Sequence, residues 1–216
     1  MGKRLLSKEM KAALCFNSPE MALQLKEQLP DVIIIDAGSN PPIEFAHMRL
    51  KENRYWVKNW HEVLTSFHNM GVKYLLMAND DITGMCETKY QNLLQIMKAT
   101  DAFMVTPSFN SPHQVFHSRG TGFREVNWVD MTCPLVDLDK FWKLGGFDLE
   151  FNGYFADIDL CYRARQKGMK MYVADHLKIH HIGGYTVSKE GTWAQSNMED
   201  NQILVKKYGK SWSELI

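Results

Sequence analysis

Two acidic clusters have the residue types and the positions needed for chemistry on a ligand. In the first, Asn79, Asp80 and Asp81 directly follow the apolar run 72–78. Adjacent carboxylates at the end of a buried strand repel each other unless a cation or a donor compensates. Hard oxygen ligands suit Mg²⁺ or Mn²⁺, which commonly also take phosphate oxygens from a substrate. The cluster therefore predicts a divalent-metal site, and its structural alternative is a turn formed by Asx side chains.

The second cluster contains Asp157 and Asp159 at the start of an expected helix over residues 157–167. A helix N-terminus favours a carboxylate, so Asp157 would be ionised and able to act as a general base. A capping role for Asp157 stays equally open on these residues alone. Asp159 and Arg163 have i,i+4 spacing, and we expect them to form an ordinary ion pair.

Weaker candidates follow other expected strands. His180 and His181 end an apolar strand, where alternation turns their rings to opposite faces, so only one of them could join a cation near the acidic cluster. Asp36 and Ser39 lie in the turn after a strand and offer groups suited to the edge of a nucleobase. Phe16, at the end of the first strand, could stack on that base.

The elements that must position these groups alternate along the chain. We expect strands at residues 12–16, 31–36, 72–78, 102–106, 126–131, 169–174 and 177–181, and helices at 19–29, 55–70, 87–99, 139–144, 157–167 and 197–208. The β-branched run 32–35 is typical of a buried parallel strand. The pattern predicts an α/β fold, in which ligands bind at the carboxyl ends of strands.

Composition narrows the classes of function. Lys plus Arg and Asp plus Glu both number 25, so the chain has no net charge and lacks the basic footprint of a nucleic-acid-binding protein. No apolar stretch approaches the roughly 18–20 residues that span a bilayer. The four cysteines lack the spacing of a zinc site and are expected to be reduced thiols. We therefore expect a cytoplasmic protein without a membrane span.

Taken in order, six segments resemble the family 2 glycosyltransferases with the GT-A fold: CFNSPEMALQL, DVIIIDAGSN, ENRYWVKNWHEVL, YLLMANDDI, LGGFDLEFNGYFADIDLCYRARQKG and KIHHIGGYT. The resemblance implies one domain over residues 1–216, with a mixed, mostly parallel sheet flanked by helices. Residues 1–106 would form its Rossmann-like nucleotide-sugar-binding half and residues 107–216 its acceptor and catalytic half. The fifth segment is most similar to rhamnosyltransferase-type members, and the compact length is similar to that of a chlorella-virus glycosyltransferase domain.

The activity implied by this resemblance is inverting transfer of a hexose or deoxyhexose, such as glucose or rhamnose, from a UDP-sugar to a glycan hydroxyl, with Mn²⁺ or Mg²⁺. Asp81 would hold the metal, with His181, and less so His180, beside the metal or the diphosphate. Asp157 would be the general base. The residues implied for the nucleotide-sugar are Phe16, Asp36, Ser39, Asn79 and Asp80.

Two departures keep alternatives open. Asn79 stands where the metal-binding motif often begins with Asp, and Ala156 stands where the acidic-pair motif often has Glu. They would fit a degenerate, non-catalytic domain that binds a sugar nucleotide. A nucleotidyltransferase is the other alternative, although no Gly-rich basic phosphate loop follows the first strand.

Two further expectations concern the acceptor side. Trp128 and Trp193 lie in segments that could stack on a sugar, and residues 184–196 could form a lid over the donor.

Overall fold

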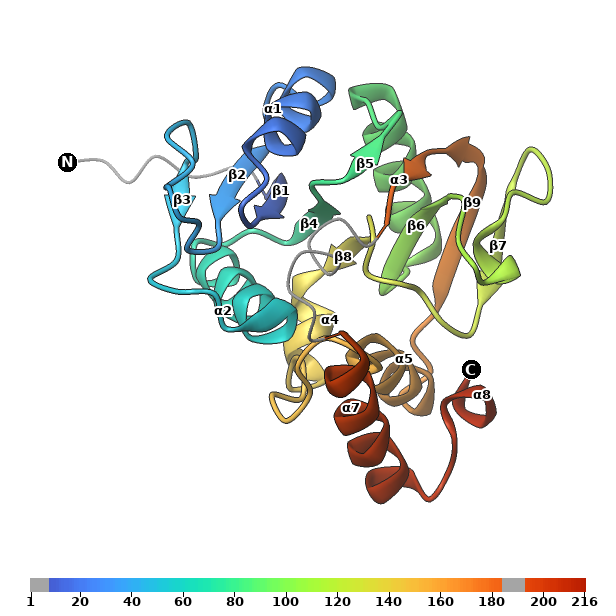
Figure 1. The fold of residues 1–216 in the computed structure, drawn as a ribbon. Helices are drawn as coiled ribbons and strands as arrows, with labels where there is room; N and C mark the ends of the chain where they lie inside the picture. Colours follow the sequence, from blue (N-terminus) through green and yellow to red (C-terminus); the bar gives the residue numbers. More distant parts are fainter. Residues whose placement is uncertain (1–7, 184–192) are drawn as a thin grey trace.

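The structure is a computed structural model that describes residues 8–183 and 193–216, with the backbone alone for residues 193 and 194. Its centre is an eight-stranded sheet in the order β3-β2-β1-β4-β8-β6-β9-β7 (Figure 1). These strands are β1 (Glu9–Cys15), β2 (Ile33–Asp36), β3 (Met48–Arg49), β4 (Tyr74–Asn79), β6 (Met104–Ser108), β7 (Phe123–Val126), β8 (Leu135–Asp137) and β9 (Met171–Lys178). The neighbours from β3 to β4 are parallel, as are β6 and β9, whereas β8 runs antiparallel to both β4 and β6, and β7 antiparallel to β9.

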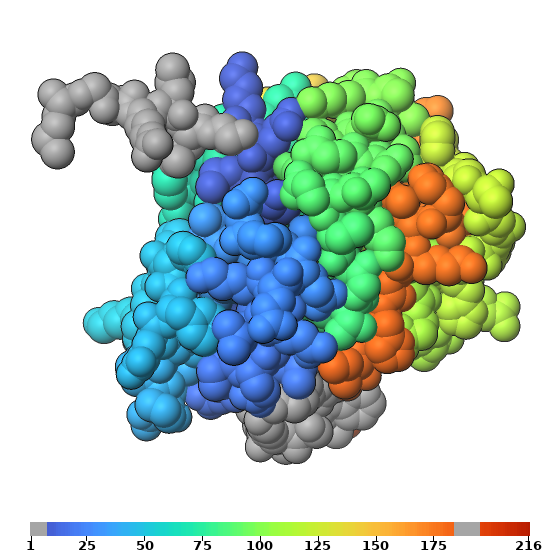
Figure 2. Space-filling model, turned by 90° about the horizontal axis from the view of Figure 1, so that it is seen from above, coloured from blue at the N-terminus to red at the C-terminus, as the bar shows by residue number. Residues whose placement is uncertain are grey.

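Helices cover both faces of this sheet. In Figure 1, α1 (Pro19–Gln28) and α3 (Glu87–Thr100) lie above it, and Figure 2, which looks onto that side, shows the two helices next to each other. Below it lie α2 (Tyr55–Asn69), α4 (Leu138–Lys143) and α5 (Ala156–Gln166). Farther out are α7 (Trp193–Tyr208) and α8 (Trp212–Leu215). This is the predicted α/β class, a mixed and mostly parallel sheet between helices.

The register of the central strands brings their carboxyl ends to one edge. Leu14 of β1 pairs with Asn79 of β4, and Cys15 pairs with Asp36 of β2. The core explains why these segments are strands, since Ile34 and Ile35 are fully buried between the layers and a buried β-branched run favours a parallel strand. The residues that follow β1, β2 and β4 therefore start from neighbouring positions.

A second, two-stranded sheet joins distant parts of the chain. In it, β5 (Ile82–Thr83) pairs antiparallel with β10 (His180–His181), so that His181 lies opposite Ile82. Because β5 begins directly after Asp81, this pairing brings the histidines beside the acidic cluster.

One sequence-based strand assignment was wrong, one strand was missed, and two strands have different bounds from those expected. Residues 127–131, expected as a strand, lie in a loop in which Asp130 Oδ1 accepts a hydrogen bond from the Thr132 amide at 2.6 Å, and only Val126 belongs to β7. The short strand β8 was not expected. The segments 169–174 and 177–181, expected as two strands of similar length, form the long β9 followed by the short β10. The expected boundary between halves, at residues 106 and 107, falls within β6.

Within residues 8–183 and 193–216, no helix combines the length and apolar character needed to cross a membrane.

Candidate functional site

A cavity of about 850 Å³ opens where β1 and β4 end. Six of the residues predicted for the site line it: Phe16, Asn79, Asp80, Asp81, Asp157 and His181. They come from four separate segments, the ends of β1 and β4, the first turn of α5, and β10. The fold thus gathers residues from both ends of the chain around one hollow.

Asp80, in the acidic cluster, is held by a hydrogen bond from the segment that follows β1. Its side chain is buried, and Oδ2 accepts a hydrogen bond from Ser18 Oγ. Ser18 is the N-cap residue of α1, but its side chain makes this contact and no capping hydrogen bond. The pKa of Asp80 is raised to about 6, because burial and the negative charge of Asp81 together outweigh the hydrogen bond from Ser18, which lowers it. Asp80 is therefore poised to ionise fully beside a cation.

Asp81 and His181 form a direct contact. Nε2 of His181 lies 3.1 Å from Oδ1 of Asp81, and the Gly183 amide donates to Oδ2 at 3.1 Å. Burial lowers the pKa of His181, but its hydrogen bond to Asp81 and the surrounding carboxylates outweigh that effect and raise it. His180 is exposed and does not line the cavity. The alternation expected along the strand is thus observed, with His181 on the side of the acidic cluster.

This pair can be tested as a place for Mn²⁺ or Mg²⁺. In the described part of the chain, no group of three or more His, Cys, Asp or Glu side chains could hold a metal by itself. Asp81 and His181 nevertheless offer an oxygen and a nitrogen donor that already converge. Such cations are often bound through one or two protein ligands, with phosphate oxygens and water completing the shell. The donor set fits a cation that arrives with a phosphorylated ligand.

Asp157 lies on the cavity wall in the first turn of α5, where its side chain is partly exposed. Trp128 Nε1 donates to its Oδ2 at 2.7 Å. The pKa of Asp157 is raised to about 7, because burial and the charge of Asp130 together outweigh the hydrogen bonds from Trp128 and from the backbone amides at the start of α5. A carboxylate with such a pKa is suited to accept a proton near neutral pH.

Asp36 and Ser39 do not line the cavity among the described residues. Oxygens of Asp36 accept from the amides of Ser39, at 2.7 Å, and Ile43, at 3.2 Å, and form an ion pair with Arg49. Burial opposes the ionisation of Asp36, but these hydrogen bonds and the charge of Arg49 lower its pKa. Ser39 Oγ accepts from the Asn17 amide at 2.9 Å. Both side chains hold the turn after β2, and their contact with a nucleobase stays a prediction.

The expected ion pair of Asp159 and Arg163 is present at 2.7 Å, and its setting is structural. Asp159 is fully buried, and Oδ1 also accepts from Lys207 at 2.7 Å and from the hydroxyl of Tyr208 at 2.6 Å. These contacts fasten α7 to α5. Asp159 thereby helps to fix the helix that carries Asp157.

Sequence reasoning missed several residues around the site. Asn110 holds the backbone of His181 from both sides, donating to its carbonyl at 2.9 Å and accepting from its amide at 2.7 Å. Asp200 of α7 accepts from the amides of residues 152–154, which line the cavity. Asn110 lies two residues beyond the end of β6, a signal that could have singled it out, whereas nothing local marks Asp200.

The expectations for the acceptor side have a mixed outcome. Trp128 is only 5% exposed, its ring is packed against Phe116 and His113, and its N–H is taken by Asp157, so it does not offer a free face to a sugar. Trp128 does line the cavity, as do Trp56 and Trp212 of α8. The Trp193 side chain and residues 184–192 of the expected lid lie outside the described residues.

The charges on the cavity wall are one-sided. Its described lining contains four carboxylates, from Asp80, Asp81, Asp130 and Asp157, and two imidazoles, but no lysine or arginine. A ligand with a diphosphate would therefore need compensating charge from another source, and a divalent cation supplies it.

Comparison with known proteins defines the class of fold. No family model matches the chain. The structure of GalNAc-T7 with UDP, GalNAc and Mn²⁺ superimposes with a TM-score of 0.60 over 80% of this chain and 44% of that chain, at 9% identity. The protein thus has a GT-A glycosyltransferase fold, and it spans less than half of that solved structure.

Sequence relatives point in the same direction. An N-acetylglucosaminyl-diphospho-decaprenol L-rhamnosyltransferase of Mycobacterium tuberculosis is 27% identical over 90 residues, which are 41% of this chain and 29% of that protein. Uncharacterized proteins of Mycobacterium tuberculosis and Mycobacterium bovis are 25% identical over 183 residues, 78% of this chain and 70% of theirs. The rhamnosyltransferase similarity supports a role in sugar transfer, whereas these similarities lend no support to the chlorella-virus resemblance.

Proposed function

We propose that this protein is an inverting, divalent-metal-dependent glycosyltransferase. It would transfer a hexose or deoxyhexose, such as glucose or rhamnose, from a UDP-sugar to a hydroxyl of a glycan or glycoconjugate. The observation that carries the proposal is that the Asp81–His181 pair and Asp157 line the same cavity, on a GT-A fold. The four cysteines of the protein are free thiols, which agrees with a cytoplasmic location, and this location is part of the proposal.

In the proposed reaction, Asp157 accepts the proton of the acceptor hydroxyl. As that proton leaves, the hydroxyl oxygen forms a bond to the anomeric carbon, and the bond from that carbon to the diphosphate breaks, with the electron pair going to UDP. One carboxylate is sufficient for such a single displacement, which inverts the anomeric centre. The pKa of about 7 favours this role, since a general base acts best with a pKa near the working pH.

Donor binding would use side chains other than that of Asp157. Asp81 and His181 would hold the cation, with Asp80 beside the ribose or the metal. When bound, the cation neutralises the charge that develops on the leaving diphosphate. Phe16 and Asn79 would contact the nucleotide from the cavity wall, and Asp36 and Ser39 from the neighbouring turn. The lack of lysine and arginine in the described lining supports the need for the cation.

Calorimetric titration with UDP tests the donor site. We expect UDP to bind in the presence of Mn²⁺ and to bind at least tenfold more weakly after chelation. Asp81→Asn should lose the metal-supported part of the affinity, and His180→Ala, which alters the exposed histidine, should not. Equal affinity with Mn²⁺ and with chelator would contradict metal dependence.

Release of UDP from a panel of UDP-sugars then tests transfer. Asp157→Asn should lower the turnover at least a hundredfold with UDP affinity unchanged, because it removes the base and leaves the donor site. The degenerate, non-catalytic alternative rests on Asn79 and Ala156, which stand where the family motifs often have acidic residues. UDP binding without any release of UDP from the panel would support that alternative.

A further inference from the structure

The indole N–H of Trp128 donates its hydrogen bond to the carboxylate of Asp157. The loop over residues 127–134 that carries Trp128 links β7 and β8. Its indole is held by edge contacts to Phe116 and His113, with ring centroids 4.9 and 5.0 Å apart, respectively. The aromatic packing leaves the N–H directed at Oδ2 of Asp157, 2.7 Å away.

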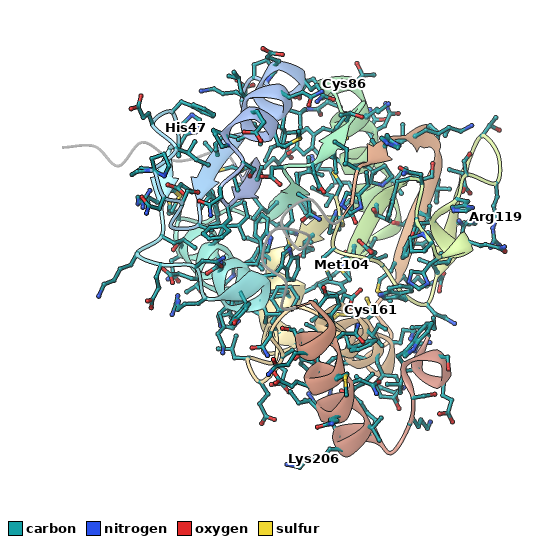
Figure 3. The ribbon with its side chains drawn as sticks, viewed as in Figure 1. His47, Cys86, Met104, Arg119, Cys161 and Lys206 are labelled. Carbon is teal, nitrogen blue, oxygen red and sulfur yellow. The ribbon has the colours of Figure 1, made fainter. Side chains whose placement is uncertain are left out.

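A second contact fixes the same loop to the same helix. The Val129 amide donates to Sγ of Cys161 at 3.4 Å, and this thiol in turn lies 3.6 Å from the Val129 carbonyl. Cys161, labelled in Figure 3, follows Asp157 by one turn of α5, so both residues share a face of the helix. Two consecutive loop residues thus contact two consecutive turns of α5, and the second contact fixes the loop backbone that carries the indole.

From this geometry we infer that Trp128 is a positioning residue, which occupies Oδ2 of Asp157 and leaves Oδ1 to receive the proton of the acceptor. The inference rests on the proposed function. An indole N–H can only donate, so it stabilises the ionised carboxylate and cannot take the proton itself. The proton given up by the acceptor hydroxyl therefore stays on Asp157.

The other groups that face Asp157 must be separated from this effect. Asp130, in the same loop, raises the pKa of Asp157 through its charge. The Cys161 thiol is neutral at ordinary pH because burial raises its pKa. His113 also contacts the indole, and His113→Gln separates its contribution to the pH profile from that of Trp128.

The test is Trp128→Phe, which keeps an aromatic ring and removes the N–H. Loss of one hydrogen bond to the charged form should move the acidic limb of kcat/KM upward by about 0.5–1 pH unit, a rate loss of about 3- to 10-fold below pH 6.5. UDP affinity should stay within twofold. Trp142→Phe is the matched control, since Nε1 of Trp142 is buried without a partner in the described structure and lies outside the cavity lining. An unchanged acidic limb in Trp128→Phe would overturn the inference.

A second readout depends neither on catalysis nor on Trp128→Phe. The indole N–H resonance of Trp128 in the unmodified protein, followed by NMR from pH 5 to 9, should titrate with a midpoint near 7, and this titration should vanish in Asp157→Asn. Its persistence in Asp157→Asn would overturn the inference even if transfer is observed. A titration that vanishes, in a protein that transfers no sugar, would retain the Trp128–Asp157 link and reject only the proposed function.

Discussion

At the scale of single residues, the site depends on carboxylates kept in unusual surroundings. Burial and the nearby charge of Asp130 raise the pKa of Asp157 to about 7. Asp148, by contrast, is paired with Lys207 at 2.6 Å, and its pKa is lowered because this ion pair and a backbone hydrogen bond outweigh its burial. The two aspartates are therefore tuned in opposite directions. Their contributions to stability should differ in sign as the pH changes.

The first residue-scale prediction concerns stability in Asp157→Asn. The folded-state pKa of Asp157 is raised, so the folded protein binds this proton more tightly than the unfolded chain. The stability from this group is fully present only below about pH 4 and is lost as the pH rises from there through about 7. Removing the ionisable group should stabilise the protein by about 1–2 kcal/mol at pH 8 and have little effect at about pH 3.5. Urea unfolding at both pH values measures the change.

Asp148→Asn provides the opposite case. The lowered pKa of Asp148 means that its contribution is present at neutral pH and lost on acidification, so this substitution should destabilise the protein at pH 8 and lose that effect toward pH 3. If both variants shift stability in the same direction at pH 8, the assigned surroundings of Asp157 are wrong.

At the scale of elements, α7 fixes the loop that leads into α5. Asp200, fully buried, accepts from the amides of Asn152, Gly153 and Tyr154 at 2.8–3.1 Å. Successive backbone N–H groups of this kind make an anion-binding concavity, occupied here by a side chain of the protein itself. The loop so held lines the cavity and leads into Asp157.

We expect Asp200→Asn to destabilise the protein by about 2–4 kcal/mol, because the amide keeps a single acceptor oxygen and loses the charge that three N–H groups share. Chemical denaturation at pH 7 measures this. Lys206→Ala is the control on the same helix, since Lys206 is exposed at the far end of α7 in Figure 3 and should change stability by less than about 0.5 kcal/mol. Equal effects of the two variants would contradict the role of Asp200 in holding this loop.

The elements also show what the sequence could and could not predict. The apolar runs that became β2 and β4 predicted buried strands, since such runs are buried on both faces in a parallel sheet. The three residues of β8 follow Pro134 and are too short to show a period. Asp200 and Trp128 act through partners 29–48 positions away, and no local pattern reports such contacts. The position of Asp81 and His181 at the cavity could be predicted, because Asp81 lies just beyond one apolar strand and His181 ends another.

At the scale of the whole molecule, the cavity connects segments from β1 to α8, so a ligand bound there contacts parts that fold together. If UDP and Mn²⁺ bind only the folded state, they should stabilise it by about 2.7 kcal/mol at a hundredfold excess over Kd. For a chain of 216 residues this corresponds to a rise in Tm of about 5–10 °C. A thermal-unfolding scan with and without chelator measures it, and an equal rise in both conditions would rule out a metal-supported site.

The placement of the tryptophans gives the protein its own optical reporter. Trp56, Trp128 and Trp212 line the cavity, whereas Trp60 is fully buried elsewhere in the core. An indole next to an arriving nucleotide base loses emission or shifts its wavelength, while a core indole supplies a constant background. Ligands can therefore be screened by intrinsic fluorescence on unlabelled protein, and single Trp→Phe replacements identify which wall of the cavity each ligand reaches.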